Sequence, residues 1–148
     1  MKRASSIVSS FIVLLFPFLT MSFAAEFKPY PGAKVDEKAT KEARQETGVT
    51  TTTIYTSSDP FDKVHAFYKG IAREYRMPPP EGPFNLRAGG TLKEAYFIFD
   101  EHPDIMSSKN WIKIQRPYLG RMKSALTPNP KYVEDIYEDI RDVTVIIR

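Results

Sequence analysis

The stretch from residue 59 to residue 75 decides the fold, and it reads Asp-Pro-Phe-Asp-Lys-Val-His-Ala-Phe-Tyr-Lys-Gly-Ile-Ala-Arg-Glu-Tyr. Asp59 is a residue type that caps helix N-termini, and Pro60 suits the first helical position. Apolar residues then recur three or four positions apart, at Phe61, Val64, Tyr68, Ile71 and Tyr75. This spacing predicts one amphipathic helix that ends near Met77, where three prolines follow. The apolar stripe of this helix has to be buried, and a sheet is its natural partner.

Four strands are predicted around this helix, because four segments are rich in β-branched and aromatic residues. They cover residues 49–56, 91–99, 110–116 and 143–147. A second helix is predicted over residues 129–140, since Asn-Pro at its start is a typical helix beginning. The approximate order is therefore β-α-β-β-α-β. We expect a single two-layer α+β domain, with helix packed on a mainly antiparallel sheet, in a ferredoxin-like or related arrangement.

Residues 34–47 are highly charged and rich in alanine. Val35, Ala39 and Ala43 lie four positions apart, which permits a short exposed helix that ends at Gly48. The apolar stripe is thin, so a solvated hairpin arm fits the sequence equally well. The pattern leaves these two alternatives open.

The N-terminus has the pattern of a cleavable secretory signal peptide. Its three parts are the basic pair Lys2-Arg3, the apolar residues 7–19, and the small residues Ser22 and Ala24. The apolar part is shorter than the roughly 20 residues that span a bilayer. We therefore expect residues 1–24 to be removed and residues 25–148 to form the mature domain. That domain is predicted to be periplasmic or secreted, with no transmembrane segment.

Composition excludes several classes of function. The chain has 148 residues and no cysteine, which excludes disulfides, thiol nucleophiles and thiolate metal sites. It carries 21 basic and 18 acidic side chains, a net charge of +3. Loss of Lys2 and Arg3 with the signal peptide leaves 19 basic residues against 18 acidic ones, a net charge of +1. So balanced a domain gives no support to a nucleic-acid partner.

Two stretches carry a resemblance to known sequences. Residues 30–33 read Tyr-Pro-Gly-Ala, and residues 55–69 read Tyr-Thr-Ser-Ser-Asp-Pro-Phe-Asp-Lys-Val-His-Ala-Phe-Tyr-Lys. Together they resemble a group of uncharacterised secreted or lipid-anchored bacterial domains, which begin with a similar turn and share this helix start. The resemblance implies a common fold. It implies no activity and no site residues.

A group of acidic residues and a histidine follows the predicted strand 91–99. Asp100, His102 and Asp104 carry groups that bind divalent cations or act in acid–base catalysis, and His65 is the other histidine that would join them. Their spacing matches no established metal signature, and the same residue types are ordinary in hairpin loops. We therefore predict no metal and no cofactor. The loop remains the candidate site of an alternative function, a small periplasmic enzyme or metal-binding protein.

The candidate binding residues are Trp111, Arg116, Tyr118 and Arg121. Trp111 is the only tryptophan, and the alternation of its strand turns it away from the face that carries Ile112 and Ile114. The three other residues form a basic and aromatic patch of the kind that meets anionic lipid or acidic glycan.

Two predicted loops, residues 77–90 and 117–130, are longer than most connections and are candidate contact surfaces. The first contains a PxxP pattern at residues 80–83, which we interpret as a stiff connection. We expect an exported, non-enzymatic binding or accessory domain of the bacterial cell envelope, with an envelope protein, glycan or lipid as its partner. A structural protein that associates through an exposed strand edge is a third possibility. The sequence identifies neither the ligand nor the oligomeric state.

Overall fold

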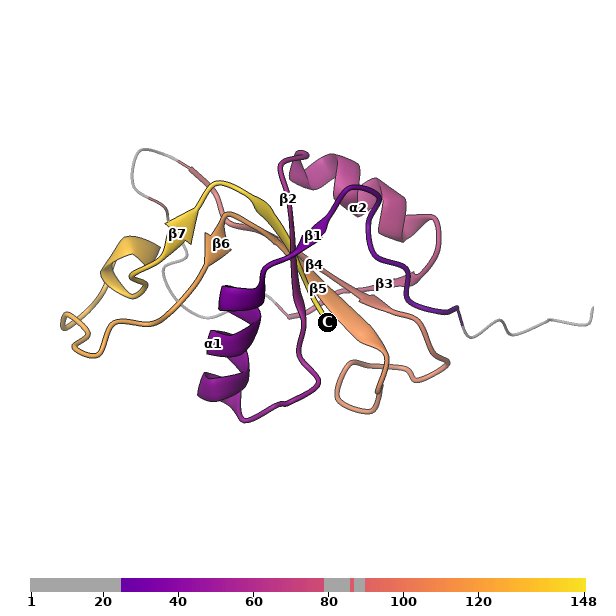
Figure 1. Ribbon diagram of the computed structural model, residues 1–148, viewed down its shortest axis with the longest axis horizontal. Coiled ribbons are helices and arrows are strands. Elements are labelled where there is room, and N and C mark those ends of the chain that lie inside the picture. Colours follow the sequence, from indigo (N-terminus) through magenta and orange to yellow (C-terminus); the bar gives the residue numbers. More distant parts are fainter. Residues whose placement is uncertain (1–24, 79–85, 87–89) are drawn as a thin grey trace, which may run out of the picture.

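The computed structural model describes residues 25–78, residue 86 and residues 90–148. The predicted signal peptide, residues 1–24, lies outside the described residues, and so does the PxxP pattern at residues 80–83. The chain in the described ranges folds as one α+β domain (Figure 1).

A six-stranded sheet forms the centre of the domain. Its strand order is β1-β2-β8-β5-β4-β3, and every neighbouring pair is antiparallel. The strands are β1 (Lys34–Val35), β2 (Ile54–Ser57), β3 (Arg73–Tyr75), β4 (Lys93–Ile98), β5 (Trp111–Arg116) and β8 (Thr144–Ile147). The prediction of an α+β domain built on a mainly antiparallel sheet is confirmed. The ferredoxin-like arrangement is wrong, because the described sheet contains no parallel neighbours.

Three of the four predicted strands contain an observed strand, namely those over residues 91–99, 110–116 and 143–147. The strand predicted over residues 49–56 is right only from Ile54 onward. The threonines before it turn instead, since the Thr52 N–H donates to the Val49 carbonyl at 3.4 Å. These residues have high β-propensity, but propensity alone does not form a strand when no neighbouring strand is there to pair with.

Helix α2 (Phe61–Lys69) packs on one face of the sheet, against β4 and β5. Its buried residues are the predicted stripe members Phe61, Val64 and Tyr68. Two details of the prediction are wrong. Pro60 is the N-cap, and the Asp59 carboxylate instead accepts hydrogen bonds from the Tyr30 hydroxyl at 2.7 Å and from a lysine.

The predicted helix also continued to Met77, whereas α2 ends at Gly70. Residues 73–75 form β3, which pairs with β4 in the register Arg73↔Ile98 and Tyr75↔Tyr96. These residues satisfy a helical spacing, but a glycine weakens the helix at that point. Residues 73–75 instead form their backbone hydrogen bonds with β4, at the edge of the sheet.

The main core lies between α2 and the sheet and contains many aromatic rings. Tyr68 is fully buried at its centre, with the rings of Phe27, Phe97 and Phe99 at centroid distances of 6.4, 5.9 and 6.2 Å. The other core residues are Tyr30, Phe61, Val64, Ala95, Ile112, Ile114 and Ile146. Ile112 and Ile114 point toward α2 as predicted, so Trp111 faces the opposite side of the sheet.

Residues 37–47 form helix α1 (Glu37–Thr47), so of the two alternatives for the charged segment 34–47 the helix is right and the hairpin arm is wrong. It packs beside β2 through a second, smaller core of Ala39, Ile54, Tyr118 and Val145. Asp36 caps its N-terminus by accepting the Ala39 N–H at 2.9 Å, and Gly48 ends it with a φ of 72°. Successive strand residues belong to different cores, as Val145 and Ile146 do. The helices α1 and α2 therefore lie on opposite faces of the sheet (Figure 1).

Residues 118–141 form an arm at one end of the sheet (Figure 1). It contains the strand pair β6 (Tyr118–Leu119) and β7 (Ile140–Arg141) and a 3-10 turn, η2 (Val133–Asp135). The helix predicted over residues 129–140 is therefore wrong. Its apolar residues have helical spacing, but Asn129 adopts a φ of 56° and Tyr137 bridges to Met122 across the arm. Cross-strand pairing within the arm replaces the helix.

Candidate functional site

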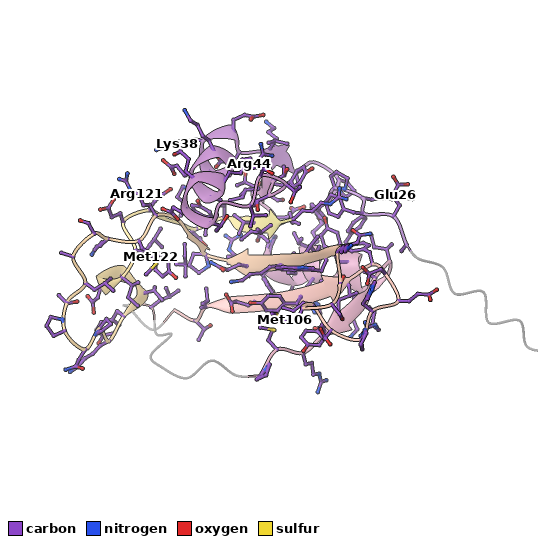
Figure 2. The ribbon with its side chains drawn as sticks, turned by 90° about the horizontal axis from the view of Figure 1, so that it is seen from below. Glu26, Lys38, Arg44, Met106, Arg121 and Met122 are labelled. Atoms are coloured by element: carbon purple, nitrogen blue, oxygen red, sulfur yellow. The ribbon has the colours of Figure 1, made fainter. Side chains whose placement is uncertain are left out.

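A groove with a volume of about 680 Å³ lies between α1 and the sheet face opposite α2. One wall is the second half of α1, and the other is formed by β6 and the residue that follows it, Gly120. Residues 49 and 51–53 also line it, and β5 contributes Trp111. Figure 2 looks onto this side of the molecule, with α1 along one margin of the strands and α2 behind them.

Three of the four predicted binding residues line this groove, namely Trp111, Tyr118 and Arg121. Trp111 is the first residue of β5, lies opposite Ile98 of β4 and is partly exposed. Its ring is tilted by 39° against the ring of Tyr96 at a centroid distance of 6.4 Å. Cross-strand packing therefore holds the indole in place at the edge of the groove.

Tyr118 and Arg121 enter the groove wall from the arm. Tyr118 is buried, and the Arg141 guanidinium lies over its ring at 4.2 Å. Burial raises the pKa of the Tyr118 hydroxyl. Arg121 donates two hydrogen bonds to Glu138, at 2.9 and 2.6 Å, and this pairing raises the pKa of the guanidinium. The charge of Arg121 is therefore largely compensated within the arm.

The α1 wall carries two carboxylates, Glu42 and Glu46, one helical turn apart. Neither forms an ion pair within the part of the chain that the structure describes. Lys109, near Trp111, is likewise unpaired there. Figure 2 labels Lys38 and Arg44 on the same helix. The Arg44 guanidinium donates to the Thr52 carbonyl at 2.6 Å, beside the groove. Sequence reasoning missed this wall: the spacing of Ala39 and Ala43 allowed for a helix here but gave no sign that the helix faces a groove.

Two contacts fix α1 relative to the groove. The Thr40 hydroxyl, buried under the helix, accepts the Ile54 N–H at 3.0 Å. The second oxygen of the Asp36 carboxylate accepts a hydrogen bond from Arg141 of the arm at 2.7 Å. Burial alone would raise the pKa of Asp36, but its bonds to Ala39 and Arg141 lower it overall. The helix wall and the arm wall are thus joined at the helix N-terminus.

The fourth predicted binding residue, Arg116, lies apart from this groove and lines a second hollow of about 650 Å³. Its Nε donates to the Asp142 carboxylate at 2.9 Å, and its Nη2 donates to the Asp142 carbonyl at 3.1 Å. Its Nη1 donates to the Asp59 carbonyl and to the Thr144 hydroxyl, both at 3.2 Å. All three guanidinium nitrogens are engaged by the protein, so Arg116 joins β5 to the starts of β8 and α2.

The acidic loop after β4 is held together by its own carboxylates. Asp100 accepts hydrogen bonds from the Ser108 hydroxyl at 2.8 Å and from the backbone N–H groups of His102 and Lys109, both at 3.1 Å. Asp104 accepts the N–H groups of the two residues that begin the next turn. No group of three potential metal ligands occurs among the described residues.

The two histidines have separate partners. The His65 ring is stacked on Phe61 and its Nε2 lies 2.9 Å from a Glu74 carboxylate oxygen. His102 pairs with Asp100, with 3.1 Å between Nδ1 and the carboxylate. Each histidine therefore has its own carboxylate partner, and the acidic loop has the architecture of a self-capped connection.

The hydrogen bonds of Asp100 predict a specific acid sensitivity. Burial alone would raise its pKa, but the bonds from Ser108 and His102 outweigh burial and lower the pKa to about 2. An unfolded aspartate titrates near pH 3.9. Its contribution to stability is therefore complete above about pH 4 and is lost as the pH falls toward about 2. In Asp100→Asn the free energy of unfolding is expected to depend less steeply on pH across this window.

Chemical denaturation at a series of pH values measures this slope. Glu101→Gln, at the exposed neighbouring position, is the matched control and is expected to keep the slope of the parent protein. Equal slopes for Asp100→Asn and the parent would contradict the prediction.

Comparison with known protein families, with curated proteins and with solved structures gives no match. Within the described ranges, no helix has the length and apolar character needed to cross a bilayer.

Proposed function

We propose that this protein is an exported, non-enzymatic binding domain of the bacterial cell envelope, and that it takes its ligand in the groove between α1 and the sheet. One observation carries the proposal: a groove of about 680 Å³ is lined by Trp111, Tyr118 and Arg121, three residues with binding chemistry. Its volume lies in the range of small-ligand sites. The basic and apolar parts of the N-terminal segment support export.

The acidic loop offers less support for the alternative enzyme or metal-binding function. Its carboxylates already accept several hydrogen bonds from the loop, so they are engaged in holding the loop itself. A general base needs a free lone pair within reach of a substrate. The groove, by contrast, presents unpaired charges beside apolar and aromatic surface.

Ala43→Phe tests the proposal by filling the groove. Ala43 lines the groove from the middle of α1, so a phenylalanine there occupies the space of the ligand. Gln45→Phe, which adds the same side chain to an exposed position of the same helix, is the control. Because Trp111 is the only tryptophan of the chain, its fluorescence reports on the groove directly.

The measurement is a titration of Trp111 emission with muropeptides, neutral oligosaccharides, anionic lipid vesicles and envelope peptides. We expect one class to produce a saturable change that Ala43→Phe weakens about tenfold or more, which is at least roughly 1.4 kcal/mol. Gln45→Phe is expected to bind like the parent. Binding that survives Ala43→Phe in a folded variant would place the ligand elsewhere and overturn the proposal.

A further inference from the structure

A small hollow of about 320 Å³ separates α1 from the arm beside the groove. Its lining is charged throughout: α1 contributes Lys38 and Glu42, and the arm contributes Arg121, Glu138 and Asp139. Figure 2 labels Lys38 and Arg121 where the helix and the arm adjoin. Glu42 and Arg121 also line the groove, so they lie on the border between the two hollows, one on each wall.

Arg121 is held on the arm by an ion pair that is easily exchanged. Its Nε and Nη2 both donate to one oxygen of Glu138, at 2.9 and 2.6 Å, and both side chains are exposed. Exposed ion pairs of this kind contribute little to stability. The pKa of the Arg121 guanidinium is raised mainly by its hydrogen bond to Glu138, and the negative charges of Glu42 and Glu46 on α1 raise it further. The helix wall therefore attracts the guanidinium away from its partner on the arm.

The charges of the groove are mixed, since Lys109, Arg121 and Arg148 line it together with Glu42 and Glu46. The Arg148 guanidinium lies over an aromatic ring of the N-terminal segment, at 4.5 Å. Neither Lys109 nor Arg148 forms an ion pair with the two glutamates within the residues that the structure describes. Arg121 shares a second hollow with Glu42, so it is the cation best placed to pair with that carboxylate.

We propose that Arg121 is a gate residue, which exchanges Glu138 for Glu42 and so bridges the arm and α1 along the border of the groove. Lys38, one helical turn before Glu42, lines the same hollow as Glu138 and pairs with it when Arg121 leaves. The exchange therefore leaves no carboxylate without a cation. The two walls are already joined at the N-terminus of α1, and the bridge adds a second link further along the helix. The purpose of the gate, retention of a ligand, rests on the binding function proposed above, but its test needs no ligand.

Two signals follow the gate in the ligand-free protein. The first is the Nε–Hε resonance of Arg121 in nuclear magnetic resonance, which is assigned by its loss in Arg121→Met. The second is the quenching of Trp111 fluorescence by acrylamide. Trp111 is the only tryptophan and lines the groove, so quenching reports access to the groove. Acrylamide is neutral, so a change in the charge of the lining does not by itself alter its approach.

The two glutamate variants are expected to move quenching in opposite directions. In Glu42→Gln the bridge is lost, so the Arg121 resonance shifts and quenching rises by up to about twofold, the limit for open and closed states of similar population. In Glu138→Gln the remaining partner is Glu42, so quenching falls. Glu37→Gln, on α1 but outside both hollows, is the control and keeps the parental values. Urea denaturation of the same samples checks that each variant is folded.

The outcomes separate the gate from the proposed function. A folded Glu42→Gln variant with the parental Arg121 resonance and parental quenching would overturn the gate, and so would equal quenching in Glu138→Gln and the parent. Neither result affects the proposed function, which depends on saturable binding that Ala43→Phe weakens. Absence of such binding would overturn the proposed function, whereas opposite changes of quenching in the two glutamate variants would still support the gate.

Discussion

Replacement of Tyr68 by alanine is expected to lower the free energy of unfolding by about 3–5 kcal/mol, the range measured for deleting a large aromatic side chain from a core. Tyr68 is fully buried, and its ring contacts those of Phe27, Phe97 and Phe99. It is the residue through which α2 meets both the sheet and the N-terminal segment. A loss of this size is a large part of the stability of a typical domain.

Tyr68→Phe is the matched control, because it keeps the ring and removes only the hydroxyl. That hydroxyl donates to the Lys28 carbonyl at 3.2 Å, so its loss is expected to cost only about 1 kcal/mol. Urea denaturation measures both variants, with the midpoint reporting the change and an unaltered slope showing that unfolding remains two-state. A Tyr68→Ala variant within 1 kcal/mol of the parent would show that the described core is wrong.

The second large effect concerns Arg116. We expect Arg116→Met to lower the free energy of unfolding by about 2–3 kcal/mol, because hydrogen bonds from a charged group are worth more than neutral ones and four of them are lost. Arg121→Met is the control with the same chemical change. The Arg121–Glu138 pair is exposed, so its loss is expected to cost less than about 1 kcal/mol.

The two arginine variants are expected to rank in the opposite order when ligand binding is measured instead of stability. Arg116 does not line the groove, so folded Arg116→Met is expected to keep the binding that we propose for the groove. Arg121→Met changes the groove wall and is expected to weaken that binding. Unfolding curves and Trp111 titrations on the same samples make the comparison. An Arg116→Met variant with parental stability and weakened binding would reverse these assignments.

The sequence predicted local features of the fold well and tertiary ones poorly. The stripe Phe61, Val64, Tyr68 is buried on α2 because amphipathic spacing is a property of the helix alone. Tyr75 continues the same spacing, yet it belongs to β3, whose existence depends on β4 lying beside it. The arm shows the same effect, since Tyr137 has helical spacing and pairs across the chain with Met122.

The types of residue in the candidate site could be predicted from the sequence, but not which of them the fold brings together. Trp111, Tyr118 and Arg121 were recognisable as candidate binding residues from their types and from their place near a long loop. Arg116 belonged to the same cluster in the sequence, but the alternation of β5 and the bends after it direct it to other partners. The wall opposite them comes from α1, far away in the sequence, so no local pattern could show that a groove exists.

The position of β8 also constrains when the molecule can fold. Residues 144–147 form the strand between β2 and β5, so the sheet is divided in two until this segment has paired with both of them. The contacts that β8 makes with β2 are among the most distant along the chain, and such contacts slow folding. Before they form, β2 lies on one side and the β3-β4-β5 meander on the other, with no strand to join them. The pairing of β8 with both neighbours is therefore the step that joins the two parts of the sheet into one hydrogen-bonded unit.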